Sequence, residues 1–307
     1  MAKKKLIVKT PDYKALTINS YLLSKFQFSF EFHNPEIYRR FWAERQNMKI
    51  KKSNLIHILE YLLLAFGIPL LCILLCRLTW IKENGALSFI LYGIEGASPT
   101  LAVIILMFIQ NKKSGLMKYL YEKYICNLDL KKCILGFFIP FILLTCAKIV
   151  AMFFGDTNRF ISPITFRKIL IISWALIAEE LGWRGFLQDK LKTLISDTYI
   201  PFIVGIIWAL WHYHFILSGS MEVPILAFTL GCIFESYGYF AVTKLAKNNI
   251  VPACIWHFTG NMMFNLYRFD PQWHNGELTF YWIATVFYSV NIVIFSVYGK
   301  KQRKHLY

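Results

Sequence analysis

The sequence predicts an all-α, polytopic membrane protein. Of its 307 residues, 56% are hydrophobic and only 17% are charged, a balance that is too apolar for a soluble domain of this length. Apolar runs of about 20 residues, the length that crosses a bilayer as a helix, recur along the chain. Ionisable residues inside three of these runs predict a catalytic site buried between the helices, because such residues are costly in a membrane.

We expect eight membrane-spanning helices in a domain that covers residues 55–300. The seventh is short and the fifth carries histidine, so these two are expected inside the bundle rather than against lipid. Prolines mark the ends or kinks of several spans, since proline cannot continue a regular helix. The eight spans lie near residues 55–80, 87–110, 133–154, 165–188, 199–217, 223–242, 250–266 and 278–297.

The basic charge of the chain predicts its topology. The net charge is +16, and 26 Lys and Arg residues fall on one set of connections against five on the other. By the positive-inside rule both termini are then cytoplasmic. This distribution fits contact with anionic lipid rather than with nucleic acid, so no nucleic-acid partner is expected.

Residues 1–54 form a basic extension outside the predicted spans. They lack the apolar core and cleavage site of a signal peptide. Phe26, Phe28, Phe30 and Phe32 alternate with polar residues, which indicates a short strand or a segment at the membrane interface. We expect a cytoplasmic or membrane-surface extension in contact with the lipid bilayer.

Three charged residues interrupt the fourth span. Glu179 and Glu180 are neighbours and therefore point about 100° apart on a helix. Arg184 lies four residues after Glu180, so the two share a face and are expected to form an ion pair within the helix. Glu179 is then left for chemistry, although all three residues could instead be structural contacts between helices.

Two later spans carry histidine. His212 and His214 lie two residues apart and face nearly opposite directions, so at most one is functional. His257 and Asn261 lie four apart and share a face. Counted from the predicted cytoplasmic ends, Glu179, His212 and His257 lie roughly 13, 20 and 10 Å deep, which favours one shared site within the membrane.

Two further acids lie inside spans. Glu95 has small neighbours, Gly93 and Gly96, which suit close helix packing, and we favour a structural role for it. Glu235 could either line the cavity or pair with a lysine or tyrosine.

At these positions the chain resembles the CAAX protease and bacteriocin-processing family of intramembrane endopeptidases, also called the Abi family. The resemblance covers roughly residues 160–265. Three motifs carry it, in order and inside spans: Glu179-Glu180-x-x-x-Arg184, Trp208-x-x-x-His212 and His257-x-x-x-Asn261. Tyr213-His214 stands where many relatives have Leu-Pro, and the extension 1–54 lies outside the pattern.

The resemblance implies a helical peptide-bond hydrolase that forms no covalent intermediate. Its catalytic set would be Glu179, Glu180, His212, His257 and Asn261, with Arg184 and Trp208 in support; the second motif selects His212 over His214. Glu179 and His212 would deprotonate a water, and His257 and Asn261 would stabilise the oxyanion. Alternatively, His212, His257 and Glu179 form an open Zn²⁺ site whose metal activates the water.

The expected substrate is a hydrophobic or membrane-associated peptide or protein. The chain resembles the bacterial branch of the family, which implies an integral protein of a bacterial cell membrane with a role in peptide maturation or bacteriocin self-immunity. A catalytically silent binding or immunity protein of the same fold remains the main alternative, and a proton-coupled transporter that uses Glu95, Glu235 and Glu179 is a third. The motifs of zincin-type, serine and aspartyl intramembrane proteases are absent from the sequence.

Overall fold

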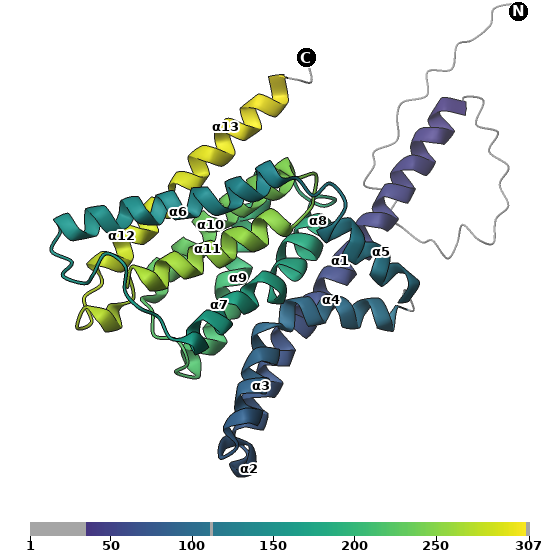
Figure 1. The fold of residues 1–307 in the computed structure, drawn as a ribbon. Coiled ribbons are helices and arrows are strands. Elements are labelled where there is room, and N and C mark those ends of the chain that lie inside the picture. The colour runs from purple at the N-terminus through teal and green to yellow at the C-terminus, as the bar shows by residue number, and fades with distance from the viewer. Residues whose placement is uncertain (1–34, 111–112, 305–307) are drawn as a thin grey trace, which may run out of the picture. The chain divides into compact units, whose positions relative to one another are not determined.

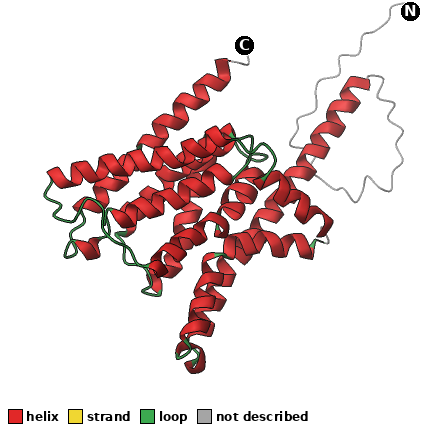
Figure 2. Cartoon of the chain, in the orientation of Figure 1, coloured by secondary structure: helices red, strands yellow, loops and turns green. Residues whose placement is uncertain are grey.

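The computed structural model describes residues 35–110 and 113–304, and all regular structure in these ranges is helical (Figures 1 and 2). The all-α prediction is confirmed. The segment predicted around residues 26–32 lies outside the described residues. The chain divides into two compact units, residues 1–49 and 50–307. The boundary that we expect after residue 54 stays a prediction.

Most helices overlap the predicted apolar runs, but α1 begins well before residue 55 and α5 lies between two predicted spans. In the first half of the chain they are α1 (Pro35–Cys76), α2 (Thr79–Lys82), α3 (Gly85–Gly96), α4 (Ser98–Ile109), α5 (Lys113–Tyr124), α6 (Leu130–Phe153) and α7 (Phe166–Ala178). They continue as the π-helix η2 (Leu181–Leu187), α8 (Gln188–Leu191), α9 (Ile200–Leu217), α10 (Ile225–Leu245), α11 (Val251–Leu266), the 3₁₀ turn η3 (Pro271–Trp273), α12 (Thr279–Tyr288) and α13 (Val290–Lys304).

The number of helices able to span a membrane is smaller than predicted. Among the described residues, five helices are long and apolar enough, and a sixth counts if α3 and α4, bent by 72° at their junction, form one broken span. The protein is therefore an integral membrane protein. Two of the eight predicted spans are not among these helices: α7 ends after 13 residues, and α11, with 16 residues, is the short seventh helix that the sequence predicts.

Local sequence explains where many helices begin. Side chains cap three of them by accepting a backbone N–H of the first turn: Asn84 on α3, Asp129 on α6 and Thr165 on α7. Helices α4, α9 and α11 each carry a proline in their first turn, where its missing N–H costs no helical hydrogen bond. The predicted role of these prolines at span ends is confirmed.

The core of residues 50–307 forms around α10 and α11. Helix α11 packs against α6 and α7, while α10 packs against α9, α12 and α13 (Figure 1). Gly205 lets α9 approach α10 closely, because a Cβ there would lie 2.6 Å from the Ile233 Cα. Close approach at small residues is the usual way that membrane helices pack.

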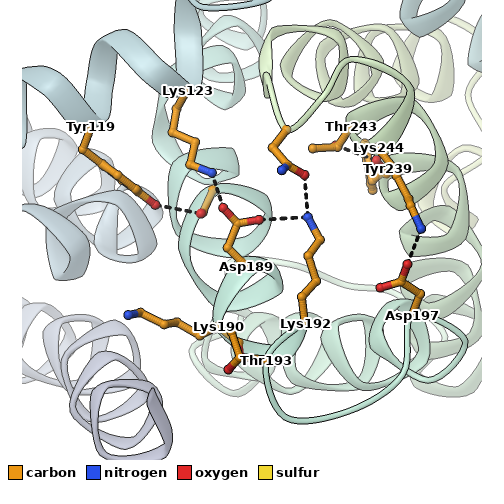
Figure 3. A network of polar contacts seen from close by, with 12 residues as sticks. Tyr119, Lys123, Asp189, Lys190, Lys192, Thr193, Asp197, Tyr239, Thr243 and Lys244 are labelled. Carbon is orange, nitrogen blue, oxygen red and sulfur yellow. Dashed lines mark hydrogen bonds and ion pairs between the residues drawn. The ribbon is translucent and has the colours of Figure 1, made fainter. Parts of the chain in front are cut away.

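A polar network closes one end of this bundle. Asp189 of α8 accepts ion pairs from Lys123 of α5 and from Lys192, and Lys244 of α10 pairs with Asp197 (Figure 3). Lys192 also donates to Asn248, at 2.6 Å. Three connections between predicted spans, which contain Lys123, residues 189–197 and residues 244–248, thus meet at one end of the bundle. The charge pattern assigns all three to the same side of the membrane. Which side of the membrane this end faces stays a prediction.

A second ionic cluster lies toward the opposite ends of α6 and α11. Lys148 Nζ lies 2.6 Å from Asp156 Oδ2, with both side chains fully buried, and it donates to the Tyr267 carbonyl at 3.2 Å. Asp156 Oδ1 also accepts from the Asn158 backbone N–H. This pair joins the end of α6 to the loops that follow α6 and α11.

We predict that Lys148→Met strongly destabilises the protein. The change leaves Asp156 buried without its cation, which typically costs about 3–5 kcal/mol. Chemical unfolding in detergent micelles, followed by tryptophan fluorescence, measures the free energy of unfolding. Lys131→Met is the matched control, since Lys131 is exposed on the same helix. Equal effects of the two changes would contradict this role of the pair.

Candidate active site

The fourth predicted span is broken at the two adjacent glutamates. Helix α7 ends at Ala178, Glu179 follows with φ −121° and ψ −41°, and residues 181–187 continue as a π-helix. The continuous helix predicted over 165–188 is therefore corrected. Short π segments within helices are frequent at functional sites, because they redirect side chains that a regular helix would space evenly.

Neighbouring contacts hold the π segment in place. Gly182 packs so closely on Pro99 of α4 that a Cβ would lie 2.6 Å from the Pro99 carbonyl carbon. Tyr119 Oη donates to the Gly185 carbonyl at 2.7 Å (Figure 3). Asp189, in the network described above, anchors the helix that follows directly. The segment is thus fixed from α4, from α5 and from its own C-terminal side.

Glu180 and Arg184 form the ion pair that the sequence predicts. Arg184 Nη1 donates to Glu180 Oε1 at 3.1 Å, and both side chains are completely buried. His257 Nδ1 of α11 lies 2.9 Å from the same carboxylate oxygen. A carboxylate can only accept, so His257 donates through Nδ1 and its Nε2 is directed elsewhere.

The guanidinium of Arg184 is enclosed by groups from two other helices. Its Cζ lies 4.0 Å from the ring centroid of Tyr239 on α10 and 4.6 Å from that of Trp208 on α9. Arg184 Nη2 donates to Ser236 Oγ at 3.4 Å. Cation–π contacts of this kind are strongest where the cation is desolvated. Arg184 therefore joins η2, α9 and α10 around one buried charge.

Glu179 has no cationic partner among the described residues. Its Oε2 accepts from Trp208 Nε1 at 2.8 Å and from Trp183 Nε1 at 3.3 Å. Two neutral indole donors orient this carboxylate without an ion pair. Adjacent glutamates thus have different surroundings, as the helical geometry predicts: Glu180 is paired with Arg184 and Glu179 is not.

His212 shares the Trp208 indole with the other site residues. The ring centroid of Trp208 lies 5.4 Å from that of His212 and 5.5 Å from that of His257. His212 Nδ1 lies 2.9 Å from the Trp208 carbonyl, which can only accept, so Nδ1 carries a proton. Within the described residues, neither His212 Nε2 nor His257 Nε2 has a hydrogen-bond partner.

Asn261 follows His257 by one turn of α11 and is partly buried. Its backbone carbonyl accepts from Asn265 Nδ2 at 2.8 Å. Its own carboxamide makes no hydrogen bond within the part of the chain that the structure describes. The carboxamide is thus available to a ligand on the same helical face as His257.

His214 lies outside this cluster. Its Nε2 is 3.0 Å from Glu95 Oε1, without hydrogen-bond geometry, and its Nδ1 lies against the Trp211 carbonyl. Trp211 Nε1 in turn donates to Ser98 Oγ at 3.0 Å. Glu95 and His214 therefore belong to the contact of α9 with α3 and α4.

The metal site that the sequence suggests stays a prediction. Among the described residues, no group of three or more His, Cys, Asp or Glu side chains is arranged to hold a metal ion. His212 and His257 each bond to the protein through Nδ1, the arrangement that leaves Nε2 for a metal or for a water. We derive no step through a metal.

Sequence analysis missed several supporting residues. Trp183, Ser236 and Tyr239 contact Glu179 or Arg184, yet none belongs to a motif. Trp183 could have been found, because it follows Glu179 by four residues and would share a helical face with it. Ser236 and Tyr239 come from another helix, and their sequence carries no signal for this contact.

Comparison with known proteins finds a family that matches the segment of the chain containing these site residues. Residues 161–263, which include every predicted site residue, match the family described as "Type II CAAX prenyl endopeptidase Rce1-like". This segment of the chain is similar to that family. It is 30% identical over 105 residues to CAAX prenyl protease 2 of Methanococcus maripaludis, and the alignment covers 31% of this chain.

The matched region spans 38% of the length of that relative, well under half of it. The likeness therefore centres on the helices from α7 to α11 that carry the three motifs. The resemblance to the CAAX protease family of intramembrane endopeptidases, expected from those motifs, is confirmed for this segment. The substrate and the catalytic roles of individual residues are matters for proposal.

We predict strong energetic coupling between Glu180 and Arg184. Arg184→Met alone leaves a buried carboxylate unpaired and costs about 3–5 kcal/mol, whereas adding Glu180→Gln recovers part of that loss. A double-mutant cycle on the free energy of unfolding in micelles should give a coupling of about 1–3 kcal/mol.

The exposed pair Lys118–Glu122, 3.9 Å apart, is the matched control for this cycle. Its coupling should stay below about 0.5 kcal/mol because solvent screens both charges. A coupling for Glu180 and Arg184 no larger than that of the control would show that the buried pair does not stabilise the site.

Proposed function

We propose that the protein is an intramembrane endopeptidase that hydrolyses a peptide bond in a membrane-associated peptide or protein. The observation that carries this proposal is the convergence on Trp208 of a carboxylate without a cation, Glu179, and two imidazoles with free Nε2 atoms. A helical bundle that merely packs has no need of these groups, since each is costly to bury.

In the proposed reaction, Glu179 and His212 act together as the general base. The neutral His212 ring keeps its proton on Nδ1, which bonds to the Trp208 carbonyl, so its Nε2 carries the lone pair. A water between this Nε2 and Glu179 would lose its proton as it attacks the scissile carbonyl. The same pair would return that proton to the leaving amine.

His257 and Asn261 would stabilise the tetrahedral oxyanion. Glu180 accepts from His257 Nδ1 and favours a doubly protonated ring, whose Nε2–H then donates to the oxyanion. The Asn261 carboxamide supplies a second donor from the same face of α11. Fixed donors in a site without bulk water are the usual source of such stabilisation.

The substrate that we propose is a hydrophobic peptide or leader reached from within the bilayer. The name CAAX prenyl protease 2 describes the relative from Methanococcus maripaludis only. For this chain we propose peptide maturation or bacteriocin self-immunity in a bacterial cell membrane, with both termini cytoplasmic. The uneven distribution of Lys and Arg supports this orientation.

The two histidines of α9 give one test of the proposed mechanism. His212→Ala should lower kcat/KM for a cleaved peptide by about 10²–10⁴-fold, the typical contribution of a general base. His214→Ala should leave kcat/KM, measured per folded molecule, within about threefold, because His214 faces Glu95. A larger loss from His214→Ala than from His212→Ala would contradict the assignment.

Released peptides give a second test and identify the substrate. Membranes that contain the wild-type protein are compared by mass spectrometry with membranes that contain Glu179→Ala, at matched amounts of folded protein. We expect peptides that only the wild type releases, since Glu179 activates the water. Glu222→Gln, a change of an exposed carboxylate before α10, should release the same peptides as the wild type.

The alternative function predicts a different result. If the protein is a catalytically silent binding or immunity protein, Glu179→Ala and His212→Ala leave both the cellular phenotype and the peptide profile unchanged. That outcome would end the protease proposal.

A further inference from the structure

One carboxylate beside the candidate active site has no role in the proposed reaction. Glu235 lies on α10, one residue before Ser236, and is partly buried. Its Oε1 lies against the bare backbone of Gly260 on α11, where an added Cβ would be 3.3 Å away. Within the described residues its side chain makes no hydrogen bond and no ion pair.

The position of Gly260 places Glu235 beside the catalytic face of α11. Gly260 lies three residues after His257 and directly before Asn261. Gly260 is therefore about 60° around the helix from His257 and about 4.5 Å along its axis. Tyr288 Oη of α12 lies 3.8 Å from the same Cβ position. Because glycine has no side chain, the Glu235 carboxylate reaches the edge of the His257–Asn261 surface.

The two nearby cationic groups, Arg184 and His257, are both committed to Glu180. Arg184 Nη1 lies 3.1 Å and His257 Nδ1 2.9 Å from Glu180 Oε1. Glu179 is held only by neutral indoles. Glu235 therefore adds a second carboxylate that lacks an ion pair, in a bundle interior where an isolated charge is strongly disfavoured.

We propose that Glu235 determines substrate specificity by binding a cationic side chain, lysine or arginine, within two residues of the scissile bond. This inference rests on the proposed function and names the substrate class of the same site. A peptide that crosses the His257–Asn261 surface would bring such a side chain past Gly260. Its ammonium or guanidinium group would then neutralise the Glu235 carboxylate and be neutralised by it.

A buried carboxylate at this place should give a strong preference for a cationic substrate side chain. An apolar pocket discriminates only weakly between substrate side chains of similar size. A buried polar group that is left without its partner, by contrast, strongly rejects the wrong substrate. A lysine side chain also brings its own charge into the membrane, which is favourable only beside a carboxylate. Substrates with a neutral side chain at this position should therefore be cleaved and bound less well.

The test uses the full chain in phosphatidylcholine nanodiscs and a library of apolar nonapeptides. Each peptide carries lysine, norleucine or glutamate at one position next to the central bond. For the wild type we expect kcat/KM for lysine to exceed that for norleucine by about tenfold or more, the scale of a desolvated charge pair. In Glu235→Gln this ratio should fall to within about threefold of unity.

Glu222→Gln is the matched control, because it removes an exposed carboxylate of the same charge. It should keep the lysine preference of the wild type. Glu235→Asp retains the charge on a shorter side chain and should keep part of the preference. This graded result separates recognition of charge from a general loss of folding.

A binding measurement separates this inference from the proposed function. Photo-crosslinking of the same peptides to Glu179→Ala protein, with and without Glu235→Gln, needs no catalysis. Suppose that the wild type cleaves no peptide, but that lysine peptides still crosslink to the Glu179→Ala protein and lose this crosslink when Glu235→Gln is added. The proposed function then fails and the inference stands. If the wild type does not prefer lysine, or Glu235→Gln keeps the preference, the inference is overturned.

Discussion

The site depends on one buried ion pair, Glu180 with Arg184. Taking two charges out of water is expensive, and a buried pair is tolerated only where further hydrogen bonds satisfy both partners. Here His257 bonds to Glu180, Ser236 bonds to Arg184, and the Trp208 and Tyr239 rings cover the guanidinium. Removing either partner would leave the other charge alone inside the membrane.

This pair also sets the geometry of the two histidines. Because Glu180 accepts from His257 Nδ1, the His257 ring has a fixed tautomer and orientation, in the manner of a carboxylate that orients a catalytic histidine. Trp208 has a similar role on α9: its carbonyl fixes His212 and its indole holds Glu179. Glu179 stands at the break after Ala178 and Glu180 stands directly before the π segment, and the two consecutive glutamates have separate partners.

Sequence reasoning could predict the parts of the site that obey helical spacing. The Glu180–Arg184 pair and the shared face of His257 and Asn261 follow from i, i+4 geometry. The i, i+2 spacing allows at most one of His212 and His214 in the site, and the resemblance to the family selects His212. The helix break at Glu179 could not be predicted, since neither proline nor glycine stands at Ala178-Glu179-Glu180. In the fold, the segment after the break packs closely on another helix, at the contact of Gly182 with Pro99.

The Lys148–Asp156 pair was missed for a related reason. A single lysine in the apolar run of α6 looks like a snorkelling residue, and its partner lies in a loop that only the folded chain brings back to it. Composition predicts one continuous span at residues 165–188, where the structure has α7 followed by the π segment, because composition alone does not reveal such a break. Contacts between distant segments, rather than local propensity, decide both features.

The most direct test of this account compares the two adjacent glutamates in one purified preparation. Glu179→Gln and Glu180→Gln are measured side by side for peptide hydrolysis and for the free energy of unfolding in micelles. The account predicts that Glu179→Gln loses hydrolysis while its stability stays close to that of the wild type, and that Glu180→Gln loses stability as Arg184 is left unpaired. A Glu179→Gln protein that still hydrolyses peptides at the wild-type rate would contradict it.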